Sequence, residues 1–202
     1  MRSEQHAWRG VAALALILLS LPALAHVEDA ARSTGFVAGL LHPILGPDHL
    51  LAMVAVGLWG AVLGRPLVVA LPIAFPLLML AGAALALFGI EIPKVEVGIA
   101  LSVVALGAAI LLAWRAPAAV AVVLVGLFGL CHGHAHGTEL PESAAPAAYA
   151  AGFLLSTGAL HLAGISLGLL WERRNGRRVL RAAGGLVCVA GVWFLLMATG
   201  TL

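Results

Sequence analysis

The chain has 202 residues, of which 62% are hydrophobic and 10% are charged, and its formal net charge is +2. Soluble domains are about one quarter charged, so this composition excludes an ordinary soluble domain and predicts a membrane protein. The near-neutral charge, with no basic stripe interleaved with aromatic residues, gives no support to a nucleic-acid partner. The cysteines, Cys131 and Cys188, lie in apolar runs and predict buried thiols, although Cys131 adjoins His132 and is a candidate soft ligand.

The first 25 residues are typical of a secretory signal peptide. Two arginines precede an apolar core from Val11 to Leu21, and Ala23-Leu24-Ala25 forms a small-residue cleavage site. The alternative is an uncleaved first helix, but the apolar core is shorter than the ~20 residues that a spanning helix needs. Cleavage after Ala25 would make His26 the N-terminal residue. Its α-amine and imidazole would chelate Ni²⁺ or Cu²⁺, so His26 is a predicted outer metal ligand, with an incidental terminal histidine as the alternative.

Residues 26–202 contain six apolar runs, each long enough to cross a bilayer. Short polar breaks separate them and leave no room for an extramembrane domain. We therefore predict an all-α membrane protein, in which a signal peptide at residues 1–25 precedes one six-span permease domain at residues 26–202. The predicted spans are Thr34–Leu63, Pro66–Ile90, Val95–Trp114, Pro117–Leu140, Ala145–Trp171 and Val179–Leu202.

The arginines predict how the spans are oriented. If the mature N-terminus is outside, the outer segments hold only Arg32 and Lys94, and the other basic residues lie inside. This bias predicts a multi-pass protein of the bacterial inner membrane with its mature N-terminus outside. Each three-span half opens with a histidine motif, which is compatible with an inverted 3+3 repeat that places an ion site near the midplane. The inner residues are Arg65, Arg115, Arg173, Arg174, Arg177 and Arg178.

The first polar motif, HPILGPDH, occupies residues 42–49 within the first apolar run. Ionisable groups in hydrocarbon are costly and mark an ion or substrate path by default. Two prolines and a glycine argue against a regular helix here, and irregular backbone at membrane depth is tolerated where it is buried or lines a cavity. Imidazole and carboxylate together suit a divalent transition metal. We therefore predict that His42, Asp48 and His49 are metal ligands.

The second polar motif, CHGHAHGTE, occupies residues 131–139 of the fourth apolar run. Helical spacing places His132, His136 and Glu139 on one face and directs His134 elsewhere. This pattern predicts His132, His136 and Glu139 as metal ligands, with Glu139 near the outer end. For His134 and His136 the alternative is a histidine-rich loop that scavenges metal loosely.

Two further residues are candidates. His161 lies in the middle of the fifth run, where it either lines the path or bonds to a neighbouring helix. Met53 lies one helical turn after His49 and offers a thioether, although core packing is the more ordinary role for a methionine.

The two motifs resemble the signatures of the HupE/UreJ family of hydrogenase and urease accessory membrane proteins. The first signature, His-Pro-x-x-Gly-x-Asp-His-x-x-x-Met, is complete from His42 to Met53. The second, Phe-His-Gly-x-Ala-x-Gly-x-Glu, is matched from His132 to Glu139, with Cys131 in place of the aromatic residue. The resemblance implies a nickel permease whose transport residues are His42, Asp48, His49, His132 and Glu139. It does not carry over His134 or His136.

The sequence therefore predicts a secondary permease, not an enzyme, that imports Ni²⁺ or Co²⁺ for metalloenzyme maturation. No Gly-x-x-x-x-Gly-Lys-Ser/Thr motif for ATP hydrolysis is present. No resident cofactor is expected, and the expected partners are the transported ion, membrane lipid and further copies of the chain in a homo-oligomer. An electron carrier with haem held by His49 and His132 is the alternative. A zinc hydrolase is disfavoured because His-Glu-x-x-His is missing.

Overall fold

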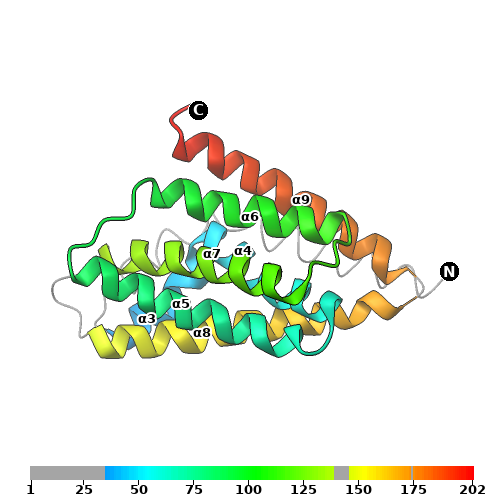
Figure 1. Cartoon of the computed structure of the whole chain (residues 1–202), viewed down its shortest axis with the longest axis horizontal. Helices are drawn as coiled ribbons and strands as arrows, with labels where there is room; N and C mark the ends of the chain where they lie inside the picture. Colours follow the sequence, from blue (N-terminus) through cyan, green and yellow to red (C-terminus); the bar gives the residue numbers. More distant parts are fainter. Residues whose placement is uncertain (1–34, 139–145, 174) are drawn as a thin grey trace.

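A computed structural model of the chain describes residues 35–138, 146–173 and 175–202, and every regular element in these residues is helical. The predicted signal peptide, residues 1–25, lies outside them. The helices, drawn in Figure 1, are α3 (Phe36–Leu45), α4 (Pro47–Leu63), α5 (Leu67–Leu87), α6 (Val95–Leu111), α7 (Ala118–Thr138), α8 (Pro146–Gly168), the 3₁₀ turn η2 (Leu169–Glu172) and α9 (Gly176–Ala198).

Four helical segments in the described residues are long and apolar enough to cross a membrane. They are α5, α7, α8 together with η2, and α9. The pair α3 and α4 passes the same test as one unit but is bent by 82°, as in a broken span or a re-entrant loop. Helix α6 is apolar but has only 17 residues. The all-α prediction is therefore confirmed, whereas a count of six spans requires that the bent pair and α6 also cross.

The first predicted run is divided by a sharp bend at Gly46. The Gly46 N–H donates to the His42 carbonyl at 3.0 Å, and the extended backbone of Gly46 (φ −81°, ψ 107°) ends α3. Pro47 then begins α4, where the missing N–H of a proline is not needed. The bend turns the last residues of α3 toward the first turn of α4. The predicted interruption of the helix is confirmed at Gly46, whereas the rest of the first motif is helical on either side of it.

The helices approach one another closely through glycine. The most extensive packing joins α5 to α7, α6 to α9, and α8 to both α3 and α4. Gly133 of α7 faces the Met79 carbonyl of α5 so closely that a Cβ atom would collide with it. Gly57 of α4 stands in the same relation to the His161 carbonyl of α8. Such small residues allow close contact between membrane helices, and they fix the two helices that carry the histidine motifs against α5 and α8.

The linkers at the two ends of the bundle differ in their number of basic residues. Those after α4, α6 and α8 lie at one end of the bundle, and the α5–α6 linker lies at the other (Figure 1). The first end carries Arg65, Arg115 and Arg173, whereas Lys94 lies in the α5–α6 linker. The described basic residues are thus distributed between the two ends as the sequence predicts.

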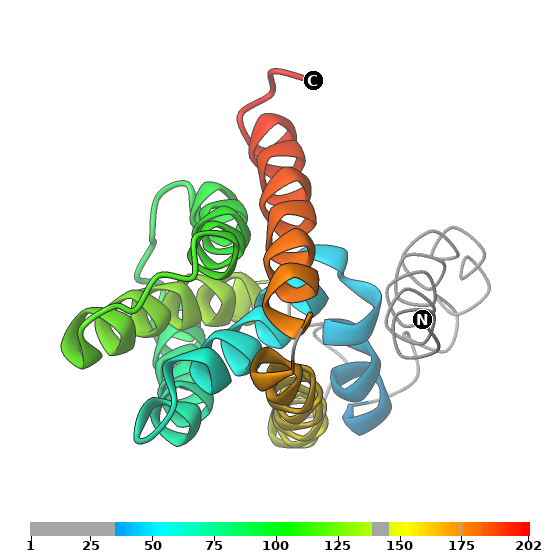
Figure 2. The same ribbon diagram turned by 90° about the vertical axis from the view of Figure 1, so that its right-hand side faces the viewer.

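Helix α9 stands at the edge of the bundle beside α6 (Figure 2). Its outer surface is apolar, and Leu186, Val189 and Trp193 are all more than half exposed. A large exposed apolar surface of this kind is typical of a face that contacts lipid or another protein.

Candidate metal site

Three histidines from three helices meet inside the bundle. His42 comes from the last turn of α3, His49 from the first turn of α4, and His136 from the last turn of α7. One ring nitrogen of each lies within 4.8 Å of the others. Because metal–imidazole bonds are about 2 Å long, these nitrogens need only a modest closure to share one ion. We call these three residues the histidine cluster.

The ring positions show how the cluster is arranged. The His136 ring centroid lies 4.6 Å from the centroids of both His42 and His49, which are 5.7 Å from each other. His136 is therefore the central member of the cluster. His49 and His136 are buried, and both His136 nitrogens lack a hydrogen-bond partner in the described structure. Buried polar atoms are normally satisfied, so unpaired nitrogens at this position favour a binding role.

Asp48 positions His49. Its Oδ1 lies 2.7 Å from His49 Nδ1 and also accepts the His49 backbone N–H at 2.8 Å. A carboxylate at this position fixes the proton of the imidazole on Nδ1, which leaves Nε2 as a bare lone pair. His49 Nε2 is buried without a hydrogen-bond partner. The structure thus places Asp48 behind His49 and not among the three clustered nitrogens.

Gly46 makes room for this arrangement. A Cβ atom at this residue would lie 3.1 Å from His49 Nδ1 and 3.3 Å from Asp48 Oδ1. These distances are tighter than ordinary van der Waals contact, so a side chain would press on the Asp48–His49 pair. The glycine of the first motif therefore serves both the bend and the site.

His132 adjoins the histidine cluster and is held by a serine of α6. Its ring centroid lies 4.7 Å from that of His49, and its Nε2 lies 3.0 Å from Ser102 Oγ. The single Ser102 hydroxyl proton is donated to the Ile99 carbonyl at 2.6 Å, so Ser102 accepts the Nε2 proton of His132. His132 Nδ1 is left as a bare, buried nitrogen. The arrangement repeats that of His49, with a serine in place of the carboxylate.

His134 points away from the cluster, as the helical spacing predicts. Its Nε2 accepts the Ile92 backbone N–H at 3.2 Å and lies 2.9 Å from the Ile90 carbonyl, in the linker between α5 and α6. His134 is therefore committed to the packing of this linker.

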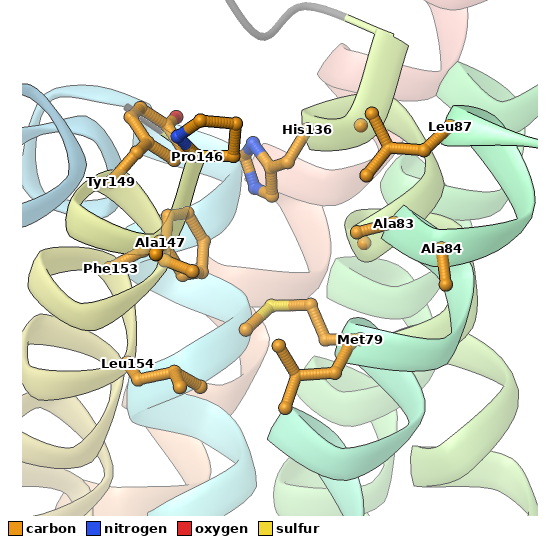
Figure 3. Close-up of a pocket in the computed structure, with 14 residues that line it drawn as sticks. Met79, Ala83, Ala84, Leu87, His136, Pro146, Ala147, Tyr149, Phe153 and Leu154 are labelled. Atoms are coloured by element: carbon orange, nitrogen blue, oxygen red, sulfur yellow. The ribbon is translucent and has the colours of Figure 1, made fainter. Parts of the chain in front are cut away.

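A cavity of about 250 Å³ lies beside His136, between α5 and α8. Figure 3 shows the His136 ring at its upper end, between Tyr149 and Phe153 on one side and Leu87 on the other. The Phe153 ring packs 4.3 Å from the His136 ring, measured between centroids. The remaining lining is almost wholly apolar. Aromatic and aliphatic side chains thus line the cavity on which the His136 ring borders.

The other predicted site residues lie elsewhere. His26 and Glu139 fall outside the described residues. His161 is buried on α8, apart from the histidine cluster, and its ring packs against Phe75 at 5.6 Å between centroids. Ser102 and Phe153 were not among the predicted residues. A lone serine within the apolar run 95–114 is a signal that could have identified Ser102, but nothing in the local pattern distinguishes Phe153 from a core phenylalanine.

Fold and site together define a helical membrane protein with a buried cluster of histidines. The model of the family described as HupE / UreJ protein matches residues 14–194 of the chain. Protein HupE of Rhizobium leguminosarum bv. viciae is 44% identical over 181 residues, which cover 90% of this chain and 95% of that protein. The chain therefore belongs to the HupE/UreJ family of hydrogenase and urease accessory membrane proteins, as its motifs predict. No solved structure matches the chain.

Proposed function

We propose that the chain is a secondary permease that imports Ni²⁺, or Co²⁺ in its place, across a bacterial inner membrane for metalloenzyme maturation. The histidine cluster of His42, His49 and His136, buried among apolar helices, carries this proposal. Imidazole nitrogen is a good ligand for nickel and its neighbours in the first transition series. The resemblance of the two motifs to the HupE/UreJ signatures also implies transport of nickel. The protein acts as a transporter and performs no chemical conversion.

The proposed path extends beyond the cluster. His132, beside His49, supplies the next bare nitrogen, and Asp48 supplies negative charge near the positive ion. Glu139 and His26 remain proposed ligands on the outer side. Successive sites of moderate affinity suit conduction, because an ion must both enter and leave each one.

We infer a topology of six spans with the mature N-terminus outside. The described basic residues support it, since Arg65, Arg115 and Arg173 share one end of the bundle. This end would face the cytoplasm. The strongest helix pairs are compatible with an inverted repeat of three spans, because exchanging the halves converts the α4–α8 contact into the α7–α5 contact. The histidine cluster lies toward the opposite, outer end.

The membrane potential is sufficient to drive uptake. It favours cation entry by about 2.3 kcal/mol per charge for each 100 mV, and by about twice that for a divalent ion. The chain contains no phosphate-binding motif of an ATPase, so coupling to the potential is the simplest mechanism.

The geometry disfavours a haem carrier. The predicted axial ligands, His49 and His132, are in edge contact with ring centroids 4.7 Å apart, which leaves no space for a porphyrin between them. A visible spectrum of the purified protein would test this alternative, because a Soret band would support haem.

Purified protein reconstituted into liposomes should take up Ni²⁺ when an inside-negative potential is imposed. Uptake should fall when the potential is collapsed, since the membrane potential is the proposed driving force. Trapped fluorescent metal indicator gives the rate, and competition with Co²⁺, Zn²⁺ and Mg²⁺ gives the ion preference. The control is liposomes without protein. A rate equal to that control at every potential would refute the permease.

His132 and His134 provide a matched comparison within one motif. His132→Ala should reduce Ni²⁺ uptake strongly, because its bare nitrogen adjoins His49, whereas His134→Ala should retain most uptake, because His134 bonds to the α5–α6 linker. Uptake is measured at equal amounts of protein in the membrane. Equal losses in the two variants would contradict the different orientations assigned to the two side chains.

A further inference from the structure

A row of side chains runs along one face of α8 from the histidine cluster into the bundle. Tyr149, Phe153, Thr157 and His161 follow one another at intervals of four residues, so they share one face of the helix. Phe153 packs against His136 in the cluster. At a rise of 1.5 Å per residue, His161 lies about 12 Å farther along the helix than Phe153. It is therefore too far away to bind the same ion as the cluster.

His161 resembles His136 of the cluster, because it is buried and both of its ring nitrogens lack a hydrogen-bond partner in the described structure. Its side chain is only 2% exposed. The Pro72 carbonyl of α5 lies beside the ring. This carbonyl has no helical partner, because Pro76, four residues later, lacks an N–H. A carbonyl can take only one of the two ring nitrogens, so the other is available as a ligand.

A thioether and a hydroxyl lie between the cluster and His161. Met53, one turn after His49 on α4, is fully buried, and its sulfur accepts a hydrogen bond from Thr157 Oγ1 at 3.4 Å. Thr157 is in turn one helical turn before His161 on α8. The face of α4 that carries His49 and the face of α8 that carries His161 therefore meet at this sulfur–hydroxyl contact.

The Phe75 ring of α5 contacts both His132 and His161. It packs 5.3 Å from the His132 ring and 5.6 Å from the His161 ring, between centroids. Phe75 therefore stands between the bare nitrogen region of His132 and the ring of His161. His161 is about 12 Å along α8 from Phe153, and two dications at that distance repel each other less than two in contact, so the geometry suits two distinct sites and not one extended site.

We propose that His161, with the Met53 thioether and the Thr157 hydroxyl, forms a second, weaker Ni²⁺ site, farther along α8 from the histidine cluster and across Phe75 from His132. The inference rests on the proposed permease function and deepens it. One imidazole with neutral sulfur and oxygen donors binds a dication less tightly than three imidazoles beside a carboxylate. A strong outer site followed by a weak inner one favours release toward the arginine-rich end of the bundle.

Equilibrium dialysis of the full-length protein in lipid nanodiscs against ⁶³Ni²⁺ tests this assignment. The wild-type protein should bind about two ions per chain, one tightly and one weakly. His161→Leu should lose the weak ion and keep the tight one, and it should slow uptake into liposomes. The isosteric double variant Met53→Leu/Thr157→Val should weaken the second ion without affecting the first. Met197→Leu makes the same methionine substitution on the exposed face of α9, away from both sites, and should leave both ions unchanged.

The outcomes separate this inference from the permease itself. His49→Ala should remove the tight ion and preserve the weak one. Retention of both ions by His161→Leu overturns the second site. A wild-type protein that transports Ni²⁺ but binds only one ion per chain overturns it as well. If His161→Leu does not fold, an unchanged weak ion in the Met53/Thr157 double variant overturns it instead. A wild-type protein that binds no Ni²⁺ and transports none refutes the proposed function together with the second site.

Discussion

Replacing His49 by alanine should abolish Ni²⁺ uptake while leaving the protein in the membrane. His49 is the one cluster member whose free nitrogen is fixed by a carboxylate, and its ring contacts His42, His132 and His136. Its removal takes away a ligand and leaves Asp48 without its partner. Asp48→Asn should have a smaller effect, about 10- to 100-fold in metal affinity, because the amide still accepts a hydrogen bond but carries no charge.

Both variants are measured by the initial rate of Ni²⁺ uptake at equal protein in the membrane. Glu172→Gln is the matched control for the loss of a carboxylate, since Glu172 is exposed at the other end of the bundle. It should transport as the wild-type protein does. Full uptake by His49→Ala would exclude the histidine cluster as part of the path.

Gly133→Ala should destabilise the whole bundle. Its Cβ would collide with the Met79 carbonyl, which is backbone of α5 and cannot turn away. The two helices would have to separate along their most extensive contact, and overpacking of this kind typically costs about 1–3 kcal/mol. Gly133 also lies between His132 and His136 on α7, so separation of the helices would displace both rings. We expect lower thermal stability and reduced transport.

Gly158→Ala is the control for this effect. Gly158 lies within α8, and a Cβ atom there would meet nothing within 4 Å. Its melting temperature in detergent, monitored as the loss of the monodisperse peak on heating, should be no lower than that of the wild-type protein, because alanine favours a helix more than glycine does. Equal melting temperatures for Gly133→Ala and Gly158→Ala would show that α5 and α7 tolerate wider spacing than the structure indicates.

The bend in the first motif was predictable because its cause is local. Proline and glycine act on the backbone of their own neighbourhood, so the interruption near Gly46 follows from the sequence. The same is true of His132 and His134, whose different directions follow from helical spacing alone. The six apolar runs likewise correspond to helical segments of the structure, since hydropathy over some 20 residues is a strong signal.

The composition of the cluster depends on how distant helices meet, and local patterns do not contain this information. Helical spacing put His136 beside His132 among the candidate ligands, whereas the family resemblance left His136 out. The structure places His136 at the centre of the cluster and Asp48 behind His49. Ser102 is some 30 residues from His132 in sequence, and only the packing of α6 against α7 shows that it holds the ring.

The cluster draws one ligand from each of three separate helices, α3, α4 and α7. An ion bound there would therefore join these three segments by direct coordination bonds, in addition to the contacts that already hold them. A ligand present at one hundred times its dissociation constant stabilises the folded state by about 2.7 kcal/mol, and this contribution disappears when the ion departs. The loaded protein is therefore expected to be more stable than the empty one, so that its melting temperature follows the occupancy of the cluster.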